Sequence, residues 1–210
     1  MPSPEEVAAP FVELVQSAVR SAEQVIFVAL DGRSGAGKST LASIAATILA
    51  ERDVRVAVIE GDQFYAGGSA ETWDTRSAEE KVANAMDWRR QRLLLTDLRS
   101  DAHGTWRSFD WEAPDWDVEP APLEAAAQHL NIENVDVLLL EGAYSARPEL
   151  HQTLDLRVLL DPPAHVRRQQ LLAREGDLYR VEWEGRWSEA EDIYFDNIMT
   201  PGHFDLVITP

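Results

Sequence analysis

An apolar run, a glycine-rich loop and a helical segment follow one another near the start of this 210-residue chain. Residues 25–30 are continuously apolar and rich in β-branched side chains, which predicts a strand buried on both faces, as in parallel sheets. Residues 39–51 place apolar side chains at helical spacing. Between them, residues 32–39 read GRSGAGKS and match G-x-x-x-x-G-K-[ST] at every fixed position. This order of strand, loop and helix predicts a loop that binds phosphate groups.

The residue types in the loop each have a physical reason. Glycines let the backbone wrap tightly and turn successive N–H groups towards a polyphosphate. The helix that begins near Lys38 directs its positive end to the same place. Lys38 would supply a point charge for the β- and γ-phosphates, and Ser39 a hydroxyl for Mg²⁺. The predicted nucleotide-binding residues are therefore Gly32, Arg33, Ser34, Gly35, Ala36, Gly37, Lys38, Ser39 and Thr40.

Strands and helices are predicted to alternate along the rest of the chain. Short, largely apolar segments predict four more strands, at residues 54–59, 135–140, 154–160 and 206–209. Helical spacing and capping signals predict helices at residues 5–22, 77–99, 163–175 and 186–199. Such alternation implies a parallel sheet with right-handed crossovers. We expect a single α/β domain over residues 1–210, with three layers and a five-stranded, mainly parallel sheet.

The composition excludes several classes of function. The chain has 37 Asp+Glu against 19 Lys+Arg, a net charge of −18, and no cysteine. This charge argues against nucleic acid and anionic membranes as partners, and the lack of cysteine removes disulfides, thiolate nucleophiles and Cys-based metal sites. Residues 1–6 lack the positive region of a secretory signal, and no apolar run approaches the ~20 residues of a membrane helix. We expect a soluble, cytoplasmic protein, either a monomer or a homo-oligomer.

Two carboxylates follow predicted strands. Glu141 and Asp62 come at the ends of the third and second strands, at the sheet edge where ligands of open α/β sheets bind. Glu141 could hold Mg²⁺ directly or through water. Asp62, beside the first strand if the usual strand order holds, could orient a hydroxyl and accept its proton. The alternatives are a solvated or helix-capping Glu141 and a loop-capping Asp62, and Asp31 is a weaker candidate.

Three segments together, residues 31–40, 61–65 and 140–142, resemble the phosphoribulokinase/uridine kinase family of P-loop kinases. Residues 167–176 resemble the lid segment of that family. The resemblance implies a P-loop NTPase fold, Mg-ATP as phosphoryl donor and a small hydroxylated metabolite as acceptor. The family's nucleoside-contacting residues find no match in residues 66–120, so nucleoside specificity is not implied.

The resemblance also implies roles for individual residues. Asp62 would be the base, Ser39 and Glu141 would surround the metal, and Arg168 and Arg174 would lie near the transferred phosphate. Guanidinium groups suit the charge that spreads over the γ-phosphoryl oxygens.

The predicted helical lid covers about residues 163–187. Arg168 and Arg174 are six residues apart, so they are not neighbours on an ideal helix, and a break near Gly176 would be needed for them to converge. The alternative is that both arginines lie on a solvated helix face.

An aromatic, acidic insert is expected on the acceptor side, at about residues 66–120. Residues 101–124 include seven acidic residues and one arginine. A segment with this negative charge suits a neutral or cationic hydroxyl compound better than an anion. The alternative is that its aromatic residues only anchor the insert to the core, and a basic pocket around Arg89 and Arg92 keeps an anionic acceptor open. The candidate acceptor-binding residues are Tyr65, Arg89, Phe109, Asp110 and Trp111.

Three functions therefore stay open. The leading one is an ATP- and Mg²⁺-dependent kinase that acts on a hydroxyl of a small metabolite, either a nucleoside such as uridine or another neutral or cationic compound. The others are an ATP-binding regulatory P-loop protein without small-molecule kinase activity, and an antibiotic-modifying phosphotransferase. The placement of Asp62 beside the phosphate site favours a kinase.

Overall fold

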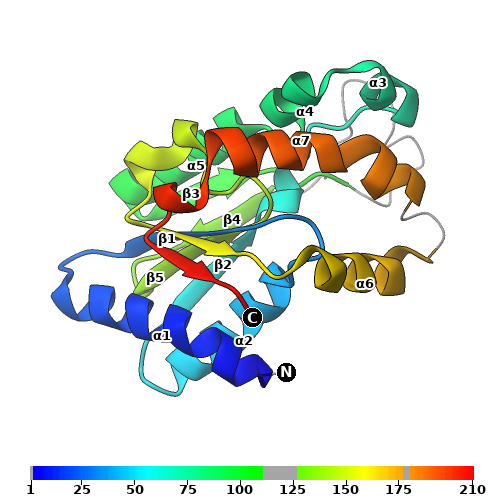
Figure 1. The fold of residues 1–210 in the computed structure, drawn as a ribbon. Coiled ribbons are helices and arrows are strands. Elements are labelled where there is room, and N and C mark those ends of the chain that lie inside the picture. Colours follow the sequence, from blue (N-terminus) through cyan, green and yellow to red (C-terminus); the bar gives the residue numbers. More distant parts are fainter. Residues whose placement is uncertain (1, 111–126, 177–179) are drawn as a thin grey trace.

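Five parallel strands form the central sheet (Figure 1). The computed structural model describes residues 2–110, 127–176 and 180–210. The strands lie in the order β2-β5-β1-β6-β7 and every neighbouring pair is parallel. They are β1 (Ile26–Asp31), β2 (Val56–Glu60), β5 (Val137–Glu141), β6 (Leu156–Leu160) and β7 (Leu206–Ile208). The predicted five-stranded parallel sheet is confirmed.

Strand β5 lies between β1 and β2. Leu140 of β5 pairs with Ala29 of β1 on one side and with Ile59 of β2 on the other. All five residues of β5 are buried, as a central strand covered on both faces requires. The expectation that Asp62 lies beside the first strand is therefore wrong. Asp62 follows β2, so its strand neighbour is β5, which ends in Glu141.

Helices cover both faces of the sheet and complete three layers, as predicted. In Figure 1, α1 and α2 lie on one face, and α5, α4 and α7 lie on the other. The longer α-helices are α1 (Pro4–Ser21), α2 (Lys38–Ala50), α5 (Trp88–Asp101) and α6 (Ala164–Glu175). The shorter α-helices are α3 (Ala70–Thr75), α4 (Ala78–Asn84) and α7 (Ser188–Ile193). Short 3₁₀ segments are η1 (Gly61–Phe64), η2 (Pro148–Thr153) and η6 (Pro201–His203), and π-helical turns η4 (Arg180–Trp187) and η5 (Tyr194–Ile198) flank α7.

The core beneath the sheet comes from the apolar stripes of α1 and α2. Ser3 and Glu6 form a reciprocal capping box at the start of α1, which satisfies backbone donors that the first turn leaves open. Phe11 and Val15 of α1 are fully buried and belong to the same cluster as Leu49 of α2. This packing holds α2, and with it the end of the phosphate loop, against the sheet.

The stretch predicted as one helix over residues 77–99 is two helices, α4 and α5. A capping box of Ser77 and Glu80, one of the capping signals in the sequence, begins α4. The break falls at residues 85–87, where Met86 bridges to Tyr65 and the Asp87 side chain accepts a hydrogen bond from Arg90 N. A tertiary backbone bridge and a new N-cap thus override the helical periodicity.

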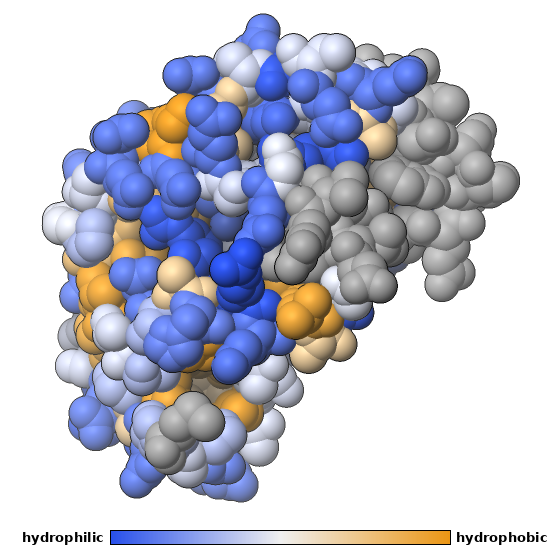
Figure 2. Space-filling view, turned by 45° about the vertical axis from the view of Figure 1, so that its right-hand side comes forward, coloured by the Kyte–Doolittle hydropathy of each residue, from blue (hydrophilic) through white to orange (hydrophobic). Residues whose placement is uncertain are grey.

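The periodicity does not predict a two-stranded ribbon that begins in the insert and ends beyond it. An antiparallel ribbon joins β3 (His103–Trp106) to β4 (Gln128–Asn131). On the face seen in Figure 2 hydrophilic residues predominate and apolar residues form small separate groups, in keeping with the charged composition. No helix in the described part of the chain has both the length and the apolar character of a membrane span.

Candidate active site

The phosphate loop connects β1 to α2. Gly35 (φ +73°) and Gly37 (φ +93°) adopt left-handed backbone conformations that glycine takes without strain. A Cβ on Gly35 would also lie 2.6 Å from the carbonyl oxygen of Arg167 on α6. Glycine at position 35 therefore lets the helix that carries Arg174 pack directly on the loop.

The first residues of α2 direct polar groups to this loop and to the end of β5. Lys38 Nζ donates to the carbonyl oxygens of Gly32 (2.9 Å) and Arg33 (3.3 Å). Ser39 Oγ donates to Glu141 Oε1 at 2.9 Å. The cation, the hydroxyl and the carboxylate thus lie together at the helix N-terminus, where an anion is stabilised.

Two glycines allow the ends of β2 and β5 to approach closely. A Cβ on Gly61 would lie 3.0 Å from the Glu141 carbonyl oxygen, and one on Gly142 would lie 3.1 Å from Gly61 Cα. Because these glycines flank Asp62 and Glu141, both carboxylates reach one cavity. Burial raises the pKa of Glu141 above its usual 4.5, the nearby charge of Asp62 raises it further, and Lys38 and Ser39 oppose the shift.

Ser39 and Glu141 fit a Mg²⁺ site. Magnesium is bound through one or two protein oxygen ligands together with phosphates and water, and a hydroxyl and a carboxylate 2.9 Å apart supply such ligands. Among the described residues, no group of three or more His, Cys, Asp or Glu side chains could hold a metal. The hydroxyl and carboxylate of the pair suit a magnesium ion that also has phosphate and water ligands.

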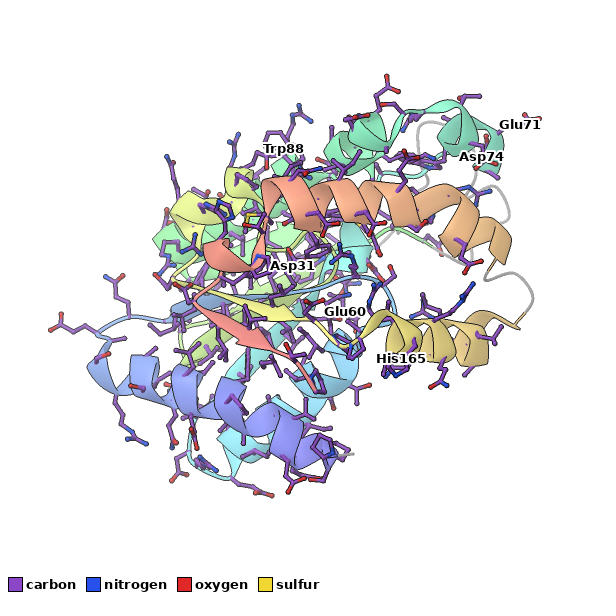
Figure 3. All side chains as sticks on the ribbon, viewed as in Figure 1. Asp31, Glu60, Glu71, Asp74, Trp88 and His165 are labelled. Carbon is purple, nitrogen blue, oxygen red and sulfur yellow. The ribbon has the colours of Figure 1, made fainter. Side chains whose placement is uncertain are left out.

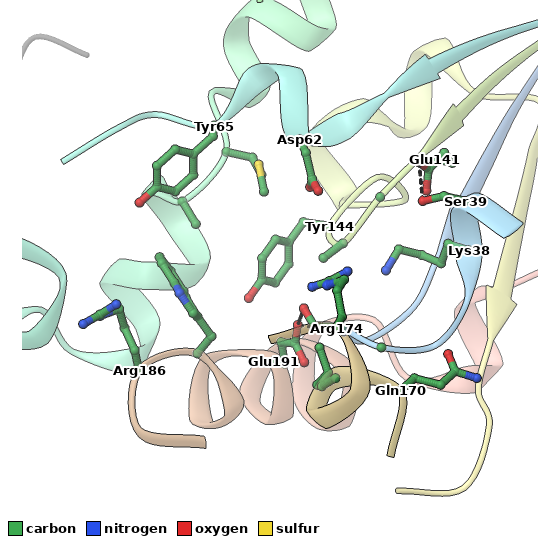
Figure 4. Close-up of a pocket in the computed structure, with 18 of the residues that line it drawn as sticks. Lys38, Ser39, Asp62, Tyr65, Glu141, Tyr144, Gln170, Arg174, Arg186 and Glu191 are labelled. Atoms are coloured by element: carbon green, nitrogen blue, oxygen red, sulfur yellow. Dashed lines mark hydrogen bonds between the residues drawn. The ribbon is translucent and has the colours of Figure 1, made fainter. Parts of the chain in front are cut away.

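A single cavity of about 490 Å³ connects the phosphate loop to an aromatic region (Figure 4). At the phosphate end it is lined by Ser34, Gly35, Gly37, Lys38, Ser39, Thr40 and Glu141. At the aromatic end it is lined by Tyr65, Trp73, Met86, Tyr144, Arg186 and Trp187. Asp62 lies between the two ends, and Arg174 extends from α6 over the middle of the cavity.

The aromatic end has a packed wall of rings. The ring centroids of Trp73 and Trp187 are 5.0 Å apart, and Tyr65 lies 6.0 Å from Trp73 and 6.4 Å from Trp187. Arg186 also lines this end, but its Nε and Nη2 donate to Asp74 at 2.6 and 3.2 Å. That contact lowers the pKa of Asp74. The wall is therefore largely aromatic, with Arg186 paired to Asp74 and the Arg76 guanidinium over the Trp73 ring.

The predicted lid arginines lie in different places. Arg174 lines the cavity, whereas Arg168 lines a neighbouring, smaller pocket and pairs with Glu184. Of the predicted nucleotide-binding residues, Gly32, Arg33 and Ala36 do not line the cavity. The Arg33 guanidinium instead pairs with Asp192 and Asp196.

The predicted acceptor-binding residues are only partly brought together. Tyr65 lines the cavity, and Phe109 is buried behind it with the ring centroids 5.0 Å apart. Arg89 is exposed and lies outside the cavity lining, with its guanidinium over the ring of Trp88, which Figure 3 labels. Asp110 also lies outside the lining, and Trp111 falls outside the described residues.

The sequence analysis did not predict several residues at the aromatic end, namely Trp73, Met86, Tyr144, Arg186 and Trp187. No local pattern could have joined them, because they come from separate elements of the fold. The abundance of tryptophan, seven residues, was the one signal available.

Asp31 is a buried centre of hydrogen bonds rather than a cavity residue. Its Oδ1 accepts from the backbone N–H of Gly32 (2.8 Å) and Tyr144 (2.9 Å), and its Oδ2 accepts from Ala146 N–H (2.9 Å) and the Tyr194 hydroxyl (2.8 Å). Burial raises its pKa to about 6, and these hydrogen bonds oppose the shift. Asp31 thus ties the start of the phosphate loop to the loop that follows β5.

The sheet carries a phosphate loop at its carboxyl edge and a carboxylate at the end of the adjacent strand, and α6 directs an arginine into the cavity between them. These are the features of a P-loop kinase. The model of the phosphoribulokinase/uridine kinase family matches residues 27–178. The chain belongs to this family.

Solved structures of other proteins share the fold. A possible uridine kinase from Bacillus stearothermophilus is 19% identical, with a TM-score of 0.67 over 95% of this chain and 98% of its own. A D-glycerate 3-kinase from Cryptococcus neoformans is 12% identical, with a TM-score of 0.65 over 96% of this chain and 93% of its own. A search of the curated proteins finds no match. At these identities the structural likeness establishes the fold alone.

Proposed function

We propose that the protein transfers the γ-phosphoryl group of ATP to a hydroxyl of a small, uncharged or cationic metabolite. The observation that carries the proposal is the single cavity with two unlike ends. Lys38, Ser39 and Glu141 line one end and aromatic side chains line the other, with Asp62 between them. A nucleotide-sensing protein would need only the first end.

Lys38 and the N–H groups of the phosphate loop would bind the β- and γ-phosphates. Ser39 and Glu141 would hold Mg²⁺, which when bound neutralises charge on the phosphate oxygens. Asp62 would orient the acceptor hydroxyl and accept its proton as the oxygen attacks. Arg174 would stabilise the charge of the moving phosphoryl group. Most of the rate enhancement would come from positioning and electrostatics.

The aromatic end favours an acceptor with a flat or apolar body. The rings of Tyr65, Trp73 and Trp187 line this end, and Arg186 is paired with Asp74. Asp62 and Glu191, which also line the cavity, add negative charge. This arrangement disfavours a strongly anionic acceptor, because Asp62 and Glu191 would repel it and Arg186 is already paired with Asp74.

The test is an acceptor panel assayed with Mg-ATP and read by ADP release. Uridine, cytidine, ribose, choline and D-glycerate cover neutral, cationic and anionic hydroxyl compounds. We expect a neutral or cationic member to raise ADP release well above the rate with ATP alone. Binding of ATP without transfer to any compound would favour the regulatory alternative, and transfer to D-glycerate alone would overturn the proposed acceptor class.

A further inference from the structure

The cavity contains a strained tyrosine that the reaction described above does not use. Tyr144 comes two residues after Gly142 in the loop that follows β5, and its side chain lines the cavity. Its backbone has φ +66°, in the left-handed region. A bulky residue rarely adopts this conformation, and one that does is held there by its surroundings, often at a functional site.

Hydrogen bonds and ring packing hold Tyr144 in this conformation. Asp31, fully buried, accepts hydrogen bonds from the backbone N–H of Tyr144 and of Ala146, both at 2.9 Å. The ring of Tyr194 packs edge-on against the ring of Tyr144, with centroids 4.7 Å apart, while its hydroxyl donates to the same Asp31 at 2.8 Å. The backbone and the ring of Tyr144 are thus both fixed.

The hydroxyl of Tyr144, in contrast, has nothing to bond to. It is buried, and it makes no hydrogen bond to any residue that the structure describes. Figure 4 shows the ring standing in the middle of the cavity, between Asp62 on one side and Arg174 and Glu191 on the other. An unpaired buried hydroxyl is unfavourable, so a strained residue that presents one to a cavity is positioned for a ligand.

The Tyr144 hydroxyl can act only as a neutral group. Burial raises its pKa well above the usual 10, and the charges of Glu191 and Asp31 raise it further. It therefore keeps its proton at working pH and can donate one hydrogen bond.

We infer that Tyr144 is an acceptor-binding residue, whose hydroxyl donates a hydrogen bond to an oxygen of the acceptor. The inference rests on the proposed kinase function. The phosphate end already has donors in Lys38, Arg174 and the loop N–H groups, whereas Asp62 can only accept hydrogen bonds and the Arg186 donors face Asp74. The acceptor would therefore carry, besides the hydroxyl held by Asp62, a second oxygen such as a carbonyl, an ether or another hydroxyl.

The test compares Tyr144→Phe with a matched control, Tyr194→Phe. Tyr144→Phe removes only the unpaired oxygen, so the thermal midpoint should stay the same or rise. The KM for the best acceptor of the panel should increase at least about tenfold, while the KM for ATP stays unchanged. Tyr194→Phe removes a hydrogen bond to the buried Asp31, so it should lower the thermal midpoint.

Three outcomes overturn the inference. They are an unchanged acceptor KM in Tyr144→Phe, a rise in the KM for ATP instead, and a loss of stability that matches Tyr194→Phe. If no panel compound is phosphorylated, binding of the same compounds in the presence of MgADP is measured by calorimetry. Weaker binding to Tyr144→Phe then supports the inference although the proposed function has failed, and the absence of binding to the wild type rejects both.

Discussion

Asp62→Asn tests the centre of the proposed mechanism. The substitution keeps the size of the side chain but removes its ability to accept a proton from the acceptor hydroxyl. General-base catalysis contributes about 10²- to 10⁴-fold to rate, so kcat should fall by at least about two orders of magnitude. The KM for ATP should not increase, because the charge of Asp62 raises the pKa of Glu141 and its removal favours the ionised carboxylate that Mg²⁺ needs.

The neighbouring Glu60 provides the control. It ends β2 (Figure 3), where it pairs with Glu141, and its charge also raises the pKa of that carboxyl, but it does not line the cavity. Glu60→Gln should therefore share the effect on Glu141 and leave kcat within about twofold, since surface changes away from a site have small effects. Both variants are assayed by ADP release with the best acceptor, and ATP affinity is measured by calorimetry. Turnover by Asp62→Asn at the wild-type level would remove Asp62 from the mechanism.

Three further predictions concern the phosphate end. Burial raises the pKa of Glu141 above 4.5, and Mg²⁺ needs the ionised carboxylate. The value of kcat/KM for ATP should therefore fall as the pH drops through this raised pKa. In Glu141→Gln this acidic decrease of kcat/KM should be absent. Gly35→Ala should weaken ATP binding and lower the thermal midpoint. The added Cβ would meet a carbonyl oxygen at 2.6 Å, and a backbone φ of +73° costs an alanine about 1–2 kcal/mol. Normal ATP affinity would contradict the loop geometry. Arg174→Ala should lower kcat by about 10³-fold, as for other arginines at the transferred phosphate. Arg168→Ala should lower kcat far less, since Arg168 pairs with Glu184 beside a different pocket. Equal losses would show that both arginines reach the phosphate.

Short-range patterns determined most of the fold. Residues 25–30 are apolar throughout and residues 135–140 are apolar except for Asp136, and the structure buries β1 and β5 inside the parallel sheet. The capping box at Ser77 predicted the start of α4 because such a cap depends on residues only three apart. The end of that helix could not be predicted in the same way, since Met86 leaves it to bridge to Tyr65.

The sequence alone predicted the phosphate loop, the carboxylates that follow the strands, and the family. It could do so because glycine conformations, caps and strand ends are local properties of the chain. The aromatic end of the cavity was not. Trp73 and Trp187 stand 5.0 Å apart although 114 positions separate them, and Asp31 reaches Tyr144 across two neighbouring strand ends. Only the tertiary structure decides such contacts, since they depend on which strands become neighbours and on how helices pack over them.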